Sequence, residues 1–128
     1  GWLQACGEKA YRPGAWASIY TDPVEPAPGA EPQYRPSPRL ERYVRARDRR
    51  CAFPGCTRRA RRSDLDHTIP WPRGDTTAEN LHPLCRRHHR LKTHSSWGLE
   101  NDDDGTWAWT TPTGRRHTKT PYDYRELR

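Results

Sequence analysis

Three cysteines and one histidine occur as two closely spaced pairs, a pattern typical of a structural zinc site. Cys51 and Cys56 enclose a Pro-Gly turn, and Cys85 is followed by His88 at the third position. Tetrahedral zinc takes thiolate and imidazole ligands in two such pairs. The spacing therefore predicts that these four residues bind zinc. A disulfide framework is the alternative, but it requires an oxidising compartment, and Cys6 would have to pair across a long proline-rich segment.

The fourth zinc ligand has competitors in the sequence. His82, His89 and His94 all lie close to Cys85. Adjacent residues of a helix point about 100° apart, so His88 and His89 do not easily bind the same ion. If His88 binds zinc, His89 faces elsewhere and is free for a second role. We expect His82 and His94 to lie on the surface.

An Asp-His pair in the stretch DLDHTIPW points to hydrolytic chemistry. Cleavage of a phosphodiester needs a base that activates water and a cation that offsets charge on the phosphoryl oxygens. The imidazole of His67 can be neutral near pH 7, which makes it the natural base. Asp66 points to the opposite face of the expected strand, where it can reach a divalent cation that His89 approaches from a helix. Each residue alone has an ordinary structural explanation, but together they favour a nuclease.

The stretches DLDHTIPW, ENLHPLC and CRRHHRLKTH resemble the HNH nuclease motif, with His67, Asn80 and His89 as its H, N and H. The resemblance covers roughly residues 37–112 and is similar to the bacterial branch in which this module ends a longer, mostly helical protein. It implies a ββα-metal fold with one structural and one catalytic metal. It also implies that His67 is the general base and that Asn80 orients it.

The resemblance further implies that Asp66 and His89 bind the catalytic cation, which would be Mg²⁺ or another divalent ion such as Mn²⁺ or Ni²⁺. The chain departs from the family pattern at two positions. His88 stands where the family usually has a second cysteine, and Ser63 stands where members of the branch often carry another cysteine. The second departure bears on the zinc ligands and leaves the nuclease residues unaffected.

The basic residues are concentrated in two arginine-rich groups. The net charge is +7, and arginines outnumber lysines by twenty to three. Arginine binds phosphate oxygens in bidentate geometry, so this bias suits a polyanion such as DNA, although a solvated charged surface is the simpler explanation. The residues predicted to contact nucleic acid are Arg47, Arg49, Arg50, Arg58, Arg59, Arg61, Arg62, Arg86, Arg87, Arg90 and Lys92.

The chain is short of aliphatic side chains. Leu, Ile, Val and Phe supply only 13 of its 128 residues, which is too few for a large core. A small domain of this kind needs a metal or disulfides to be stable. The sequence has no apolar segment long enough to span a bilayer and no secretory signal. We therefore expect a cytoplasmic protein without a membrane partner.

Helix and strand signals place these residues on short elements. Ser37, followed by proline, has the character of an N-cap and predicts a basic helix that ends near Arg49. DLDHTI predicts a strand, and PWPRGD predicts a turn. Thr76 and Glu79 form a capping-box pattern, and Pro83 is placed to open a helix that carries the second zinc pair. The implied order is strand, loop, short pairing strand and helix.

The region after this helix predicts a hairpin with an Asp-Gly turn and alternating Trp107 and Trp109. The expected fold class is therefore α+β, a small zinc-braced ββα-metal domain with a basic N-terminal helix and a C-terminal β-hairpin. We expect residues 1–36 to be a proline-rich linker or the tail of an upstream domain. Residues 37–120 would form the nuclease domain, and residues 121–128 a C-terminal tail.

The leading functional prediction is a hydrolase, a metal-dependent DNA endonuclease that leaves a 5′-phosphate and a 3′-hydroxyl. A zinc-stapled nucleic-acid-binding module without catalysis is the main alternative. A purely structural zinc knuckle is a third possibility, but it would leave the excess of arginine unexplained.

Overall fold

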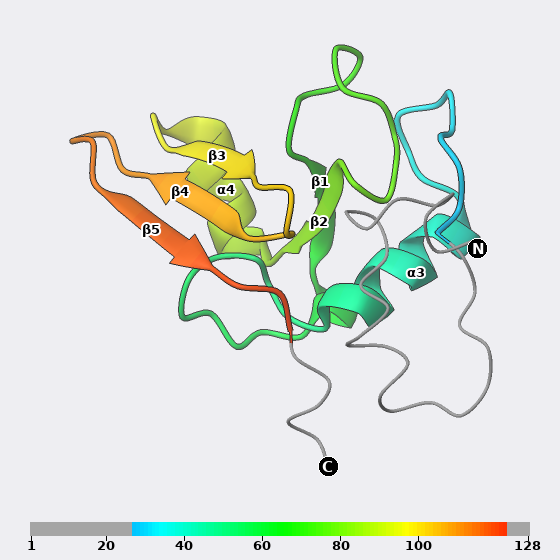
Figure 1. Cartoon of the computed structure of the whole chain (residues 1–128), viewed down its shortest axis with the longest axis horizontal. Coiled ribbons are helices and arrows are strands. Elements are labelled where there is room, and N and C mark those ends of the chain that lie inside the picture. The colour runs from blue at the N-terminus through cyan, green and yellow to red at the C-terminus, as the bar shows by residue number, and fades with distance from the viewer. Residues whose placement is uncertain (1–26, 123–128) are drawn as a thin grey trace.

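The structure is a computed structural model that describes residues 27–122 of the chain. Its elements are two α-helices, one short 3-10 helix and five short strands within the described range (Figure 1). In chain order they are α3 (Pro38–Asp48), η1 (Ala60–Arg62), β1 (Asp64–His67), β2 (Leu81–Leu84), α4 (Arg86–His94), β3 (Gly98–Asn101), β4 (Trp107–Thr110) and β5 (Arg116–Lys119). Cys6 and the outer parts of the predicted linker and tail lie outside the described residues.

An antiparallel hairpin of β1 and β2 lies at the centre of the domain, between α3 on one side and the remaining strands on the other (Figure 1). Asp64 pairs with Leu84, and His67 pairs with Leu81. Helix α4 follows β2 directly, with Cys85 as its N-cap. The predicted α+β class and the strand-strand-helix order are confirmed. Within residues 27–122, no helix has both the length and the apolar composition needed to cross a bilayer.

Helix α3 supplies the aliphatic half of the core. The Ser37 hydroxyl accepts a hydrogen bond from the Leu40 amide, and the helix ends where Arg49 adopts a left-handed backbone with φ of 62°. Both ends therefore agree with the prediction. The apolar face of the helix packs on the central hairpin and the loop before β2. The buried residues of this cluster are Leu40, Tyr43, Val44, Ala78 and Leu81.

Residues 31–36, which we call the arm, pack on the domain although the sequence analysis assigns them to a linker. The Glu31 amide donates to the Thr76 carbonyl at 2.9 Å. The Glu31 carboxylate accepts from the Ser37 amide at 2.7 Å and from the Ser37 hydroxyl at 2.5 Å. These bonds join the arm both to the start of α3 and to the loop between β1 and β2.

The strands β3, β4 and β5 form an antiparallel meander on the other side of the central hairpin. The predicted hairpin corresponds to β3 and β4, with Gly105 at φ 87° in the turn, and β5 adds a third strand that was not predicted. Trp107 and Trp109 point into an aromatic core that also contains two of the expected zinc ligands. The buried residues of this core are Cys51, Ala52, Leu84, Cys85, Trp107 and Trp109.

Two local predictions between the strands are wrong. Pro83 lies in β2 opposite Leu65, and α4 begins only at Arg86. The carbonyl of Pro83 accepts a hydrogen bond from the Ala52 amide at 2.8 Å. Strand β2 therefore continues through the proline, and its outer edge contacts the turn that begins at Cys51. Thr76 caps no helix: it pairs with Glu31 in an isolated bridge, and its hydroxyl donates to the Gln33 carbonyl of the arm. The turn before β2 begins at Thr77, whose carbonyl accepts from the Asn80 amide.

Candidate active site and zinc cluster

The side chains of Cys51, Cys56, Cys85 and His88 converge, and their ligand atoms all lie within 4.8 Å of one another. The Nδ1 atom of His88 is 3.5 Å from Cys51 Sγ and 3.3 Å from Cys85 Sγ. Zinc bonds of about 2.0 to 2.3 Å in a tetrahedron place sulfur and nitrogen about 3.5 Å apart. The cluster therefore fits a tetrahedral zinc ion. The three cysteines in it are free thiols, not disulfides.

A tight turn and a helix N-terminus position these ligands. The Cys56 amide donates to the Phe53 carbonyl, across a turn in which Gly55 has a φ of +77° that favours glycine. The Cys85 amide donates to Cys51 Sγ at 3.3 Å. Burial raises the pKa of the Cys51 thiol to about 12. A thiolate at this position therefore needs a bound cation.

Lys119 and Phe53 close the cluster from outside. The Lys119 ammonium, at the end of β5, donates to the carbonyls of Cys51 at 2.7 Å, Cys56 at 2.8 Å and Phe53 at 3.3 Å. The ring of Phe53 stacks on His88 with centroids 3.9 Å apart. Lys119 of the meander therefore fixes the cysteine turn, and Phe53 within that turn orients the histidine.

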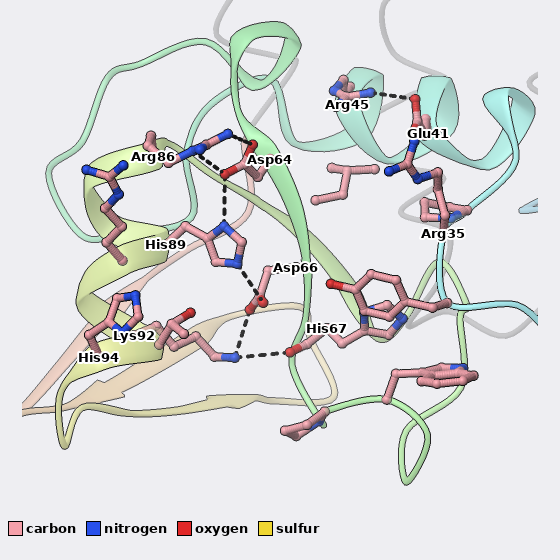
Figure 2. A pocket seen from close by; sticks show the side chains of 17 residues that line it. Arg35, Glu41, Arg45, Asp64, Asp66, His67, Arg86, His89, Lys92 and His94 are labelled. Carbon is pink, nitrogen blue, oxygen red and sulfur yellow. Dashed lines mark hydrogen bonds and ion pairs between the residues drawn. The ribbon is translucent and has the colours of Figure 1, made fainter.

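Strand β1 presents two carboxylates to α4. Asp64 and Asp66 are two residues apart and so lie on the same face of the strand. His89 lies between them, with Nδ1 at 2.8 Å from Asp64 Oδ2 and Nε2 at 3.3 Å from Asp66 Oδ1 (Figure 2). A carboxylate beside Nδ1 holds the proton on that nitrogen, so the lone pair of Nε2 is available to a metal ion. This is the usual arrangement around metal-binding histidines. Asp66 and His89 therefore form a candidate cation site.

Asp66 also faces two further cationic or basic groups. Its Oδ2 atom is 3.1 Å from His82 Nε2 and 2.8 Å from Lys92 Nζ. Burial would raise the pKa of Asp66, but the contacts with His82 and Lys92 outweigh it and hold the pKa well below its usual value. Asp66 Oδ2 and His82 Nε2 are both buried, and their polar contacts are these ion pairs. Such atoms can coordinate a divalent cation, and the residues present therefore fit a catalytic metal.

His67 lies on the opposite face of β1 and is 5% exposed. Its Nε2 is 3.0 Å from the Thr76 hydroxyl, which donates its only proton to the Gln33 carbonyl at 2.6 Å. The hydroxyl oxygen must then accept from His67 Nε2, which leaves Nδ1 as the nitrogen that can take a proton. Burial lowers the pKa of His67 and is only partly opposed by Asp66, so the ring is neutral near pH 7. The Tyr34 ring stacks on His67 at 5.3 Å.

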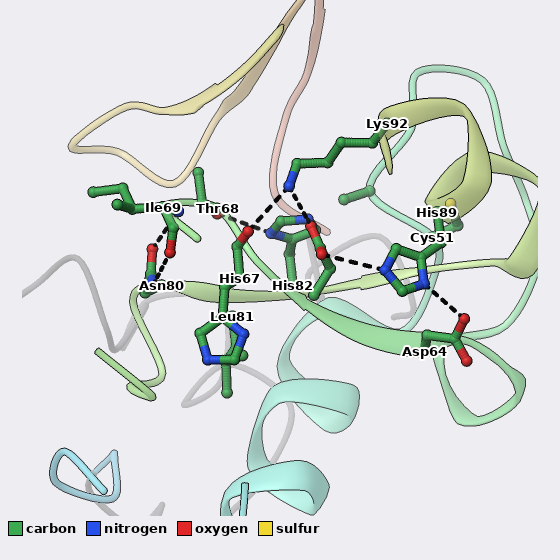
Figure 3. A network of polar contacts seen from close by, with 12 residues as sticks. Cys51, Asp64, His67, Thr68, Ile69, Asn80, Leu81, His82, His89 and Lys92 are labelled. Carbon is green, nitrogen blue, oxygen red and sulfur yellow. Dashed lines mark hydrogen bonds and ion pairs between the residues drawn. The ribbon is translucent and has the colours of Figure 1, made fainter. Parts of the chain in front are cut away.

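Asn80 holds the loop that follows β1. Its Oδ1 accepts from the Ile69 amide at 2.8 Å, and its Nδ2 donates to the carbonyls of Ile69 and Asp75 at 2.9 Å (Figure 3). A Cβ atom at Gly74 would lie 2.2 Å from the Ile69 carbonyl and 2.5 Å from Asn80 Nδ2, so only glycine fits there. The hydrogen bonds of the Asn80 side chain go to backbone groups of Ile69 and Asp75 and not to the His67 ring. Asn80 can reach His67 only through the backbone that it holds.

The two faces of β1 border one cleft of about 930 Å³. Asp66, His67 and His89 all line it (Figure 2). The remaining lining includes basic side chains from the arm and from α4, among them Arg35 and Arg90. The candidate base and the candidate cation site therefore open on the same solvent-filled space, beside positive charge.

Residues 49–95 match the family model described as HNH endonuclease. The chain carries an HNH endonuclease domain. The matched segment contains the zinc cluster and all three residues of the H-N-H pattern. The arm, most of α3 and the meander lie outside it. Part of the cleft of this HNH domain is therefore built by segments that the family model does not include.

Three curated relatives come from Mycobacterium tuberculosis. The chain is 47% identical over 93 residues to Uncharacterized protein Rv3776 (strain H37Rv), covering 72% of this chain and 18% of that protein. It is 46% identical over 111 residues to Uncharacterized protein MT2160 (strain CDC 1551), covering 86% and 20%. It is 30% identical over 83 residues to Uncharacterized protein Rv1702cMb1728c, covering 64% and 18%. The chain thus spans about a fifth of their length, and no solved structure matches it.

The arginines predicted to contact nucleic acid divide into one buried residue and an exposed group. Arg47 is 3% exposed, and its guanidinium donates to both Asp48 oxygens and to the carbonyls of Ala78 and Leu81. It is a core residue of the HNH domain, and the prediction that it contacts nucleic acid is wrong. The exposed residues are Arg49, Arg50, Arg58, Arg59, Arg61, Arg62, Arg86, Arg87 and Arg90.

Two members of the set have particular surroundings. Lys92 is largely enclosed, and its ammonium donates to the His67 carbonyl at 3.1 Å as well as facing Asp66. Arg86 forms an ion pair with Asp64 at 2.9 Å while most of its side chain stays exposed. A separate groove of about 610 Å³ beside α3 is lined by Arg45, Ala46, Arg49, Arg50, Thr57, Arg59 and Arg61.

Sequence reasoning missed several residues of the HNH site. His82 was expected on the surface, but it is fully buried between Asp66 and the Thr68 hydroxyl, at 2.8 Å from the latter. Asp64 could have been found, because the alternation in DLDH places it beside Asp66. Thr76 and Lys119 act across long sequence separations, and no local pattern marks them.

Proposed function

We propose that this domain is a metal-dependent DNA endonuclease with His67 as its general base. The observation that carries the proposal is the arrangement around β1. Strand β1 offers the imidazole of His67 on one face and Asp66, paired with His89 of α4, on the other, and both faces border the same cleft. A hydrolytic site needs these two functions within reach of one phosphate.

Each residue of the site has a distinct task in this proposal. A bound Mg²⁺, or another divalent cation such as Mn²⁺ or Ni²⁺, would offset the charge that builds on the phosphoryl and leaving oxygens. Asp66 and His89 would hold it, with Asp64 fixing the His89 proton on Nδ1. His67 takes the proton of the attacking water at Nδ1, while Thr76 keeps its Nε2 protonated. The products would be a 5′-phosphate and a 3′-hydroxyl.

The remaining parts of the domain support this chemistry. The cluster of three cysteines and His88 would hold a structural zinc ion, because its four ligand atoms lie within 4.8 Å of one another and are of the types that zinc binds. The exposed arginines would bind the DNA backbone, since each guanidinium can neutralise a phosphate. We assign the functional unit to residues 37–120 together with the arm, whose Tyr34 contacts the candidate base.

Cleavage of supercoiled plasmid tests the proposal. Wild-type protein with Mg²⁺ or Mn²⁺ should cut the plasmid, and His67→Ala should cut about 10² to 10⁴ times more slowly because it lacks the proton acceptor. DNA binding and zinc content should persist. His117→Ala, an exposed histidine on β5, is the matched control and should cut at the wild-type rate. Equal rates for His67→Ala and wild type would favour a non-catalytic nucleic-acid-binding module.

A further inference from the structure

Of the three large hydrophobic side chains that are most exposed in residues 27–122, Tyr34 and Trp71 line the cleft, and Ile69 lies two residues before Trp71. Tyr34 is 60% exposed, Ile69 is 54% exposed and Trp71 is 42% exposed. Tyr34 stacks on the His67 ring, and Trp71 meets Tyr34 edge-on with centroids 5.8 Å apart. We call Tyr34 and Trp71 the aromatic edge. Single exposed apolar side chains are common on protein surfaces, but exposed apolar side chains that lie next to one another mark a binding surface.

The aromatic edge is held in place by the fold. Asn80 fixes the backbone of Ile69 through both its amide and its carbonyl, and Gly74 is packed beneath this contact. The arm that carries Tyr34 is joined to Thr76 by a backbone hydrogen bond from Glu31. A surface fixed in this way can bind a flat ligand without first becoming ordered.

The surroundings of the aromatic edge point to a nucleic acid as its ligand. The same cleft is lined by Arg35, Arg90 and Lys92, which favour an anionic ligand. A nucleotide combines a phosphate for the cations with a flat base for the rings. Stacking needs an accessible base face, and in a paired duplex the neighbouring base pairs cover that face. A base inside an intact duplex is therefore not accessible for stacking on Tyr34 or Trp71.

We infer that the aromatic edge stacks an unpaired nucleobase next to the phosphate that is cut, so that the domain prefers DNA with unpaired bases at the cleavage site. The inference rests on the proposed function, because it identifies the DNA structure that the same cleft selects. Trp71 is the residue that tests the preference, because it belongs to the aromatic edge and its ring meets Tyr34, whereas Tyr34 is the ring that stacks on the general base His67. Tyr34 contributes to both stacking and the environment of His67.

Three DNA substrates of one sequence test this inference. They are a single strand, a fully paired duplex and a duplex with one unpaired base, each with 2-aminopurine at the position beside the cut. Binding is measured with zinc-loaded protein and no added cation, and cleavage is measured with Mg²⁺. The unpaired substrates should show quenched 2-aminopurine fluorescence and bind roughly tenfold more tightly than the paired duplex, the scale of one stacked base.

Trp71→Ala should remove most of this difference, lowering affinity for the unpaired substrates about tenfold and leaving the paired duplex little changed. Trp71→Phe should restore it in large part, because phenylalanine also offers a ring face. Quenching that is equal for all three substrates, or unchanged in Trp71→Ala, would overturn the inference while His67-dependent cleavage still supported the proposed function. Loss of cleavage on every substrate with quenching retained would instead overturn the proposed function alone.

Discussion

The domain contains two clusters of candidate metal ligands, and they differ in how far the surrounding protein encloses them. The cysteine cluster is enclosed by an aromatic core, and Lys119 binds the three carbonyls of its turn. The cluster around Asp66 borders an open cleft, and ion pairs with His82, His89 and Lys92 hold its carboxylate. The cysteine cluster offers a complete set of four zinc ligands, whereas the cluster around Asp66 offers two cation ligands, Asp66 and His89, and stays open to solvent.

This difference separates stability from activity. Closed four-ligand zinc sites contribute directly to folding, whereas catalytic sites keep coordination positions open for water and substrate. Changes to the cysteine cluster should therefore act first on the folded state. Changes around Asp66 should act on cation affinity and leave the fold intact.

The largest effect is expected from loss of the zinc cluster. Cys51→Ser, or removal of zinc by a chelator, should unfold the domain, because structural zinc contributes on the order of 10 kcal/mol of apparent binding energy and the aliphatic core is small. Far-UV circular dichroism and thermal melting measure this change. Thr57→Ser, in the same turn but outside the cluster, should melt like wild type. An unchanged transition in Cys51→Ser would remove the distinction between the two clusters.

A smaller effect is expected when the open cluster loses the carboxylate behind its histidine. Asp64→Asn should weaken binding of the catalytic cation about 10- to 100-fold, because His89 Nδ1 loses the group that holds its proton. Titration calorimetry with Mn²⁺ and the Mg²⁺ dependence of cleavage measure the change, and zinc content should stay at the wild-type level. Asp102→Asn, on the meander, is the control. Equal cation affinity in the two variants would show that Asp64 has no part in the site.

Lys119 offers a graded test of the closed cluster. Lys119→Met should lower the free energy of unfolding of the zinc-loaded domain by about 1 to 3 kcal/mol, because the carbonyls around the cysteines lose a buried charged donor. Denaturant unfolding measures the change. Arg116 lies on the same strand and its side chain is exposed. Arg116→Met should therefore change the free energy of unfolding little. If both variants unfolded alike, the contacts of Lys119 would add nothing to the cluster.

The smallest effect concerns the groove beside α3. Arg59→Gln and Arg61→Gln should each lower the slope of log binding affinity against log salt by about 0.9, the contribution of one phosphate contact to duplex DNA. Arg115→Gln, on a turn of the meander, should leave the slope unchanged. A slope that does not differ between the groove variants and wild type would exclude this groove from the DNA-binding surface.

Features with a local cause could be predicted from the sequence. The cysteine and histidine spacing predicted the convergence of Cys51, Cys56, Cys85 and His88, because these residues belong to one turn and the first turn of one helix. Helix α3 was predicted because Ser37 and the following proline are sufficient to begin it. The alternation of β1 placed Asp66 and His67 on opposite faces.

Features that depend on tertiary contacts could not be predicted. Pro83 looked like the start of a helix, but pairing with Leu65 keeps it in a strand. His82 and Arg47 looked like surface residues, because only the folded chain supplies the carboxylates and carbonyls that make their burial possible. The third strand of the meander likewise carries mostly exposed polar residues and has no apolar alternation that would mark it.

Because α4 follows β2 with only Cys85 between them, the position of α4 also sets the register in which β1 pairs with β2. Leu84, the partner of Asp64, is followed at once by the candidate zinc ligand Cys85, so a bound metal would anchor one end of a ladder only four residues long. A slip of one residue would turn every side chain of β1 to the other face. Asp66 would then point toward the arm, and His67 would point toward α4. By fixing this alignment, a zinc ion remote from the reaction would decide which residue serves as base and which as cation ligand.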